Sequence, residues 1–338
     1  MKKIYYITAV FATLFLVGCG DGIDLPGVNV ETDLNKIPLP DNNVNLEQVE
    51  LKPSTEPMLH EGLHTEEDFQ RIRDKKAAGE EPWVSAYQLL VESQFSQKTA
   101  DTYPTEWIKR GISGDENYMN AARGATIVYQ QALRWKIEQD DEYAAKAVEN
   151  LNKWVQTCVG VTGNTNLSLA AGLYGYEFAI AGELLRDYGG WDRADFAAFQ
   201  NWLLKVFYPA NDDFLKRHHD TNALHYWANW CLCNIAAKMA IGIVTDRRDI
   251  YNEGIDHLQT GDTNGRLRRA IYHDYAPDYN FAQWQESGRD QGHTLMCVGL
   301  MGIICQLAWS QGDDFFAYDD NLFLRACEYA ACCNYTNE

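Results

Sequence analysis

Residues 118–135 read YMNAARGATIVYQQALRW, and the apolar residues in this stretch recur every three or four positions. That spacing places them along one side of an α-helix, which is the pattern of a helix that packs against a core. Residues 143–158 repeat the pattern after a short polar link. The sequence therefore predicts two consecutive amphipathic helices.

Similar apolar periods continue on both sides of this pair. Upstream, Thr65 followed by Asp68 predicts a capping box, and Pro82 predicts the first position of a second short helix. Strand-like alternation is scarce, and no repeat of fixed period is present. We therefore predict an all-α fold over residues 59–338, an (α/α) toroid or incomplete barrel of antiparallel helix pairs rather than an open helical-repeat module. The later helices are expected near residues 166–188, 193–207, 222–244, 247–258, 292–311 and 321–334.

The N-terminus has the pattern of an export signal. Two lysines precede an apolar run over residues 4–17, which is shorter than the roughly 18 residues that span a bilayer. The run ends in LVGC at residues 16–19, which resembles a bacterial lipobox. We therefore predict a lipoprotein signal peptide over residues 1–18 and acylation of Cys19.

The segment after this signal is rich in Asp, Asn, Pro and Val without a helical period, so residues 19–58 are predicted to form a flexible tether behind the acylated cysteine. The protein is then expected to be an exported bacterial lipoprotein of the outer membrane, on its periplasmic face or at the cell surface. Its contact with the membrane would be the lipid anchor only. We expect a monomer.

Composition limits the partners. The chain has 338 residues, of which 46% are hydrophobic and 23% charged, so it is too apolar to be disordered throughout. Its net charge of −19 repels phosphate backbones and excludes nucleic acid as a partner. An anionic polysaccharide stays open, because a few Arg and His side chains in a cleft can reverse the local potential. The cysteines other than Cys19 lie mostly in apolar helical stretches and are expected to be buried thiols, without the spacing of a zinc site.

Polar and aromatic residues gather over positions 272–293, immediately before an apolar helix. Within this cluster, four side chains have the spacing that places them on one helical face: Glu286, Arg289, Asp290 and His293. One interpretation is a structural network of arginine and carboxylates that caps the following helix. The other is an anion-binding site, in which Arg289 grips a carboxylate and His293 titrates.

A second polar and aromatic cluster spans residues 216–230 and enters another apolar helix. Together the two clusters hold five of the eight histidines. In a toroid with one functional rim, helices that begin with such clusters would open onto the same cleft. We therefore predict that Asn229 and Arg289 lie in a shared site.

At these residues the chain resembles the alginate lyase superfamily, whose members are polysaccharide lyases with an (α/α) toroid. The resemblance implies a lyase that cleaves a 4-linked uronate polymer, alginate or a related uronan, by β-elimination. We expect no cofactor and no metal. The resemblance to this family rests on four stretches of sequence: Met58-Leu59-His60, Ala132-Leu133-Arg134-Trp135, Asn229-Trp230 and Gln285-Glu286-Ser287-Gly288-Arg289-Asp290-Gln291-Gly292-His293.

The resemblance also implies roles for individual residues. Asn229 and Arg289 would neutralise the substrate carboxylate and stabilise the enolate-like charge. One branch of the family has a tyrosine seven residues after the matched arginine, where this chain has Met296. The candidate bases are His225 and His293, and the candidate proton donor is Tyr279 or Tyr272. The expected substrate-binding residues are Asn222, Tyr272, Trp284, Gln285 and Glu286.

Two other classes of function stay open. A toroid glycoside hydrolase would use paired carboxylates, and a non-catalytic surface glycan-binding lipoprotein would hold sugar on exposed aromatic side chains and release no product. Relatives usually continue beyond Glu328-Tyr329, so either a truncated C-terminus or a differently closed fold is expected. The carboxylates available to a hydrolase are Asp274, Asp278, Glu286 and Asp290.

Overall fold

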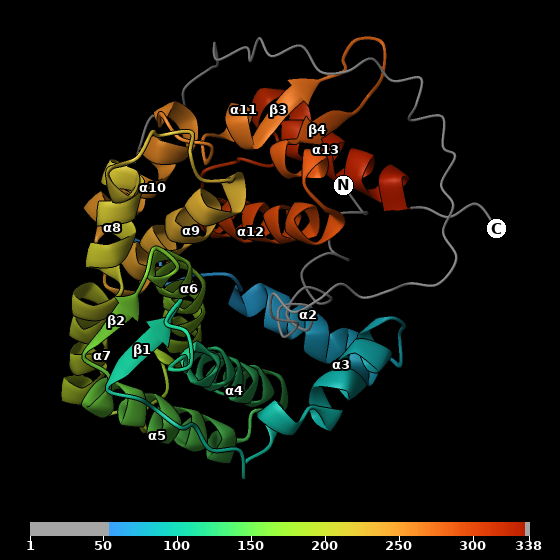
Figure 1. Cartoon of the computed structure of the whole chain (residues 1–338). Helices are drawn as coiled ribbons and strands as arrows, with labels where there is room; N and C mark the ends of the chain where they lie inside the picture. The colour runs from blue at the N-terminus through green and yellow to red at the C-terminus, as the bar shows by residue number, and fades with distance from the viewer. Residues whose placement is uncertain (1–53, 335–338) are drawn as a thin grey trace.

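The computed structural model describes residues 54–334, so the predicted signal peptide, Cys19 and most of the predicted tether lie outside the described residues. Helices dominate, and Figure 1 shows them arranged in pairs along a curved row that stays open between α13 and α3. The predicted all-α architecture is confirmed. The helices are α2 (Glu66–Ala77), α3 (Trp83–Glu92), α4 (Tyr118–Glu138), α5 (Asp141–Thr157), α6 (Leu167–Leu185), α7 (Arg193–Val206), α8 (Tyr208–Arg217), α9 (Ala228–Val244), α10 (Arg248–Thr260), α11 (Leu267–Ala270), α12 (Gln291–Ser310) and α13 (Tyr318–Asn334).

The central helices α4, α6, α9 and α12 lie next to one another in that order. Nearly every residue of α6 and α9 is buried, which explains why their sequences are apolar on all sides. Gly172 allows these two helices to approach closely, because a Cβ there would lie 2.5 Å from Sγ of Cys233. By length and composition α12 could cross a membrane, but 56% of its apolar window is buried inside the fold, as in a core helix.

The central helices run in the same direction. At one end, the Arg186 guanidinium that follows α6 donates to the carbonyl of Val244 at the end of α9, at 2.9 Å. At the other end, Ser168 in the first turn of α6 contacts His219, in the segment before α9, at 3.0 Å. The first residue of α4, Tyr118, also stacks on α6. Near the start of α12, Met296 contacts Asn229 in the first turn of α9. The starts of α4, α6, α9 and α12 therefore share one end of the molecule, which we call the rim.

The chain before α2 crosses the end opposite the rim. The side chain of Gln311, after α12, accepts from the backbone N–H of Leu59 at 2.9 Å and donates to its carbonyl at 3.0 Å. Met58 is buried, and Arg248 of α10 donates to the Glu56 carbonyl. Part of the segment 54–58 therefore packs on the helical domain.

Two short sheets were not expected from the sequence. β1 (Trp107–Arg110) pairs in parallel with β2 (Gly160–Gly163), and β3 (Ile271–Asp274) pairs antiparallel with β4 (Ala282–Trp284). The helix predicted over 222–244 begins only at Ala228, and a loop with left-handed backbone at residues 218–220 precedes it. These irregular segments lie next to the rim and carry most of the predicted site residues.

The cysteines follow the expectation for most positions. Cys332 is exposed, and Cys327 and Cys333 are partly buried. The buried thiols are Cys158, Cys231, Cys233, Cys297 and Cys305.

Candidate active site

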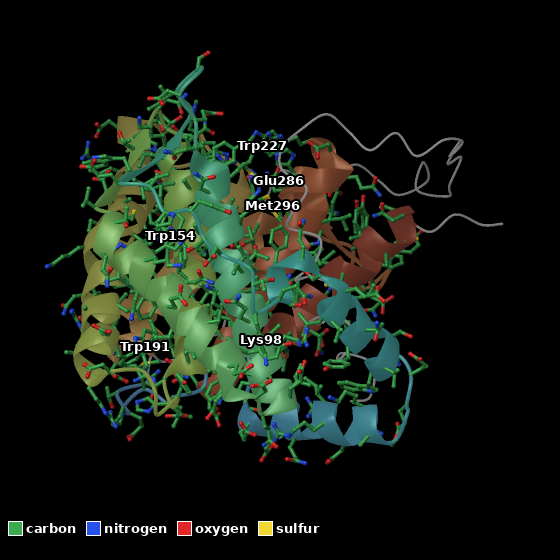
Figure 2. The ribbon with its side chains drawn as sticks, turned by 90° about the horizontal axis from the view of Figure 1, so that it is seen from below. Lys98, Trp154, Trp191, Trp227, Glu286 and Met296 are labelled. Carbon is green, nitrogen blue, oxygen red and sulfur yellow. The ribbon has the colours of Figure 1, made fainter. Side chains whose placement is uncertain are left out.

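The two polar clusters meet where α9 begins. The residue before α9, Trp227, makes no side-chain cap, so the first N–H groups of the helix need acceptors from elsewhere. They find them in a 3₁₀ turn (η5, Gln285–Gly288): Gln285 Oε1 accepts from the N–H of Ala228 at 2.8 Å, and Glu286 Oε1 accepts from the N–H of Asn229 at 3.2 Å. Figure 2 shows Trp227, Glu286 and Met296 grouped together, away from Lys98 and Trp191. The two clusters are therefore in contact at the start of α9, and the shared substrate site stays a prediction.

Arg289 lies next to this junction, and its guanidinium makes no close hydrogen bond to either neighbouring carboxylate. Its side chain is 33% exposed, and its Nη1 is 3.6 Å from Glu286 Oε2 while its Nε is 3.8 Å from Asp290 Oδ2. Both separations are longer than a charge-assisted hydrogen bond, so neither carboxylate occupies the guanidinium fork. The guanidinium carbon is 5.6 Å from the centroid of the Trp227 ring, which supports it from one side. Arg289 can therefore accept a further carboxylate from solvent.

His293 is oriented by Asp290. Asp290 is the N-cap of α12 and accepts from the N–H of His293 at 2.8 Å, and its other oxygen is 2.7 Å from His293 Nδ1. Burial raises the pKa of Asp290, but the two bonds to His293 and the nearby charges outweigh it, so the net pKa is below its ordinary value. An ionised carboxylate only accepts, hence Nδ1 carries the proton and Nε2 of the neutral ring is left as a base.

The prediction that Glu286, Arg289, Asp290 and His293 lie on one face of a single helix is wrong. η5 ends at Gly288, and Asp290 is extended, with φ −167° and ψ 164°, before α12 starts. The residues of the cluster are brought together by this cap and not by a continuous helix. The arrangement is both a capping network and an exposed cation beside an imidazole, so the two interpretations of the cluster describe the same structure.

Glu286 is fully buried beneath Arg289. Its side chain has no exposed surface, and Oε2 makes no hydrogen bond within the described residues. Burial raises the pKa of Glu286, while the bond from Asn229 and the charges of Arg289 and His293 oppose the rise. Glu286 therefore holds Arg289 and α9 in place and does not reach the solvent.

Asn229 and Arg289 both lie next to Glu286, but the side-chain amide of Asn229 is buried. The residue is 3% exposed, its Nδ2 lies 3.7 Å from Sδ of Met296, and its Oδ1 has no partner among residues 54–334. A thioether is a weak acceptor, so this buried amide is poorly satisfied. Met296 of α12, at the position where one branch of the family has tyrosine, therefore covers the amide of Asn229 of α9.

Three of the predicted substrate-binding residues, Trp284, Gln285 and Glu286, have structural contacts in the fold. Trp284 is fully buried and its indole donates to the carbonyl of Ala326 at 3.0 Å, so it packs β4 against α13 and cannot contact a substrate. Gln285 and Glu286 cap α9. The prediction that Trp284 and Glu286 touch the substrate is wrong because both side chains are buried, and Gln285 spends its carbonyl oxygen on the cap.

The remaining predicted residues lie on the flanking loops. Asn222 and His225 are exposed in the loop before α9, where Asn222 Oδ1 accepts from the N–H of Leu224 at 2.8 Å. Tyr279 is 46% exposed in the β3–β4 hairpin loop, and burial raises the pKa of Tyr272 on β3. No contact joins these four residues to Arg289 or His293 within the described chain, so their predicted roles stay predictions.

Two residues of the site were given no role in the predicted lyase site. Asp290 was expected only in a capping network or as a carboxylate of a hydrolase, although its spacing to His293 is that of an N-cap and the third helical residue. Trp227, 39% exposed, has no comparable sequence signal, since its neighbour Trp230 is equally aromatic. Among residues 54–334, no group of three His, Cys, Asp or Glu side chains is placed to hold a metal ion.

Three of the four carboxylates that were named for a hydrolase are committed elsewhere. Asp274 is paired with Arg268, at 3.1 Å, and with Arg325. Glu286 is buried, and Asp290 caps α12. Asp278 is exposed in the loop between β3 and β4, but with the other three carboxylates paired, buried or capping a helix this set offers no pair of free carboxylates.

Comparisons with solved structures identify proteins with a similar fold. Among solved structures, a variant of alginate lyase A1-III in complex with a tetrasaccharide is 14% identical, with a TM-score of 0.62 over 83% of this chain and 82% of that chain. Alginate lyase A1-III from Sphingomonas species A1 is 14% identical, with a TM-score of 0.57 over 82% and 80% of the two chains. An alginate lyase from Bacteroides ovatus is 14% identical, with a TM-score of 0.56 over 80% and 82%. At these identities the likeness shows a shared fold.

The sequence itself decides the family. No curated protein matches the chain. The alginate lyase family, however, matches it over residues 73–334, which includes every central helix and the whole rim. With an α/α toroid fold and this family match, the chain belongs to the alginate lyase family and is a polysaccharide lyase.

Proposed function

We propose that the protein cleaves alginate, or a closely related 4-linked uronan, by β-elimination at the rim. The observation that carries this proposal is the pair formed by Arg289 and His293. Both side chains border Asp290: the partly exposed guanidinium of Arg289 has no tight carboxylate partner, and the imidazole of His293 is oriented by Asp290 through Nδ1. The starts of the central helices add positive potential at the same end, which favours an anionic substrate despite the net charge of −19.

In the proposed reaction Arg289 binds the carboxylate, and His293 acts first as the base and then as the acid. The C5 proton of a uronate is weakly acidic until the adjacent carboxylate is neutralised, and Arg289 supplies the fork that binds this carboxylate. His293 Nε2 takes the C5 proton, the electron pair of that C–H bond forms the C4=C5 double bond, and the C4–O4 bond breaks. The imidazolium at His293 then returns its proton to the O4 leaving group, so atoms and charge balance without water being consumed.

The assay is a panel of uronans that differ in sugar and linkage. Elimination leaves an unsaturated uronate that absorbs in the near ultraviolet, whereas hydrolysis yields new reducing ends without this absorbance. We expect absorbance to rise with alginate or a related uronan. Reducing ends without absorbance would indicate a hydrolase, and binding without either product would indicate a glycan-binding protein.

We also propose that the mature protein is an exported lipoprotein held at the outer membrane through Cys19. The support is the LVGC sequence at residues 16–19 after a short apolar run. Replacement by Cys19→Ala is expected to abolish incorporation of a palmitate analogue into the protein. Labelling that persists in this variant would contradict the proposal.

A further inference from the structure

Arg110 is a buried arginine without a carboxylate. It ends β1 and is 9% exposed, and its Nη1 has no hydrogen-bond partner among residues 54–334. The other two buried arginines of the described chain are both paired, Arg134 with Glu138 and Arg325 with Asp274. A buried charge without a partner costs several kcal/mol of free energy, so its presence calls for a compensating anion.

The acidic residues nearest in sequence do not provide that anion. Asp115 Oδ2 is paired with Lys109 Nζ at 2.7 Å. Glu116 accepts from the backbone N–H of Gly111. Both carboxylates are therefore held by other donors in the turn that follows Arg110, and neither makes an ion pair with its guanidinium.

The backbone and the guanidinium of Arg110 are both held in place by neighbouring residues. Its guanidinium lies over the ring of Tyr118 at 4.7 Å from the ring centroid, and Tyr118 stacks on Tyr174 of α6. The backbone of Arg110 pairs with Gly163 of β2. A Cβ at residue 163 would lie 1.7 Å from the Arg110 carbonyl oxygen, so only glycine permits this close approach. Strand and ring together hold the guanidinium in a fixed orientation.

This arginine lies at the rim, one helix away from Arg289. α6 packs on α9 through Gly172 and Cys233, and Cys233 is one turn beyond Asn229. Burial raises the pKa of Cys233, and the charge of Arg110 opposes that rise, so the two groups are close enough to interact. Arg110 is thus on the α4–α6 side of α9, while Arg289 is on the α12 side.

We propose that Arg110 binds the carboxylate of a second uronate unit of the polymer, distinct from the unit whose carboxylate is neutralised by Arg289. The inference rests on the proposed function, because a polymer that carries one carboxylate per sugar can engage two arginines on the same rim. Tyr118 keeps the guanidinium planar against its ring and leaves the edge of the fork for the carboxylate. Arg110 is then a binding residue that sets the preference for a charged polymer, not a residue that takes part in bond breaking.

The test compares Arg110→Met with Arg123→Met, which removes an exposed arginine from the same helix that Tyr118 begins. On the uronan that wild type cleaves fastest, Arg110→Met is expected to raise KM by about tenfold or more with a much smaller change in kcat, which corresponds to about 1.4 kcal/mol of binding. Arg123→Met should leave KM unchanged. A carboxyl-reduced, neutral oligosaccharide of the same length should bind wild type and Arg110→Met equally.

Thermal stability separates binding from a structural role. Because the unliganded enzyme has no partner for the charge, Arg110→Met should melt at the wild-type temperature or above it. In an Arg289→Ala background, which slows turnover, a uronate tetrasaccharide should raise the melting temperature, and Arg110→Met should abolish most of this rise. If Arg110→Met does not fold, Arg110→Lys retains the charge without the fork, and it should show a KM between those of the other forms.

The outcomes distinguish the inference from the proposed function. A wild-type enzyme that forms unsaturated product, with the same KM and ligand-induced melting shift in Arg110→Met, overturns the role of Arg110 and leaves the lyase function intact. A wild type that forms no product but is stabilised by the tetrasaccharide only when Arg110 is present overturns the lyase function and supports the binding role. If no uronan gives unsaturated product and no uronate tetrasaccharide raises the melting temperature of wild type or of Arg289→Ala, both the lyase function and the role of Arg110 are overturned.

Discussion

Asp290 accepts two hydrogen bonds from His293, one from its backbone N–H at 2.8 Å and one from its ring Nδ1 at 2.7 Å. The first bond caps α12, and the second fixes which ring nitrogen carries the proton. One carboxylate therefore begins the helix and prepares the base at its first turn. The pairing explains how an apolar core helix can start with a titratable side chain aimed at the rim.

The variant Asp290→Asn tests this pairing. Asparagine is as good an N-cap as aspartate, so the melting temperature should change little. Its amide can present N–H₂ to the ring, which favours the tautomer with the proton on Nε2 and removes the base. We expect turnover to fall by roughly 100-fold or more, measured as near-ultraviolet absorbance, because comparable loss of a tautomer-fixing carboxylate is severe in other enzymes.

A matched control for this experiment is Asp192→Asn. Asp192 caps α7 by accepting from the N–H of Ala194 at 2.7 Å, away from the rim. This variant should retain wild-type turnover. Equal turnover in the two variants would contradict the assignment of His293 as the base.

Replacement by Arg289→Lys tests the neutralisation of the substrate carboxylate. Lysine keeps the charge but loses the planar fork, so turnover should fall by at least about tenfold, or about 1.4 kcal/mol of transition-state stabilisation. Arg289→Ala should lose more. Arg123→Lys, at an exposed position of α4, should be neutral.

Melting curves are needed beside these rates, since Arg289 also lies over buried Glu286. A purely structural role would lower the melting temperature together with the rate. An Arg289→Lys protein with native melting and unchanged turnover on its best uronan would show that the guanidinium does not bind substrate.

Local features of the fold could be predicted from the sequence. Thr65 and Asp68 form the expected capping box, with both reciprocal bonds present, because all of its atoms lie within one turn. The amphipathic stripe over 118–135 matches α4, which spans Tyr118–Glu138. In both cases the decisive contacts are between residues three or four positions apart, so a pattern in the sequence contains the information.

Features that depend on distant segments could not be predicted. β1 and β2 pair across about 50 residues, and each has only four residues. The caps of α9 come from Gln285 and Glu286, 57 residues later in the chain. The sequence indicated polar residues suited to a substrate-binding site. It could not show that the side chains of Gln285 and Glu286 accept hydrogen bonds from the first N–H groups of α9.

Trp284 illustrates the same limit and gives a prediction. Its position in a polar stretch favoured sugar binding, whereas its ring is fully buried and contacts Phe323 of α13. Trp284→Ala should lower the free energy of unfolding by about 3–5 kcal/mol, as measured by denaturant titration. Trp227→Ala, at a 39% exposed position, should cost much less stability. A small loss for Trp284→Ala would contradict its place in the core.

The stability of the domain should depend on pH through His64. Burial lowers the pKa of His64 from 6.5 to about 4, with the charge of Asp68 opposing, and its Nε2 is 2.6 Å from the Tyr129 hydroxyl. Between these two pKa values the unfolded chain binds more protons than the folded chain at this residue. The free energy of unfolding must therefore decrease as the pH falls from 6.5 to about 4, and be unaffected by His64 above that window.

Replacement by His64→Gln isolates this contribution, because glutamine can still bond to the Tyr129 hydroxyl but does not titrate. We expect the loss of unfolding free energy on acidification to be smaller in the variant than in wild type, by about 3 kcal/mol at most. His257, whose pKa burial also lowers to about 4, leaves a residual dependence of the same sign. His225→Gln, at an exposed position, should keep the wild-type dependence. Denaturant titrations at several pH values measure all three proteins, and identical slopes for wild type and His64→Gln would show that His64 is solvated in the folded state.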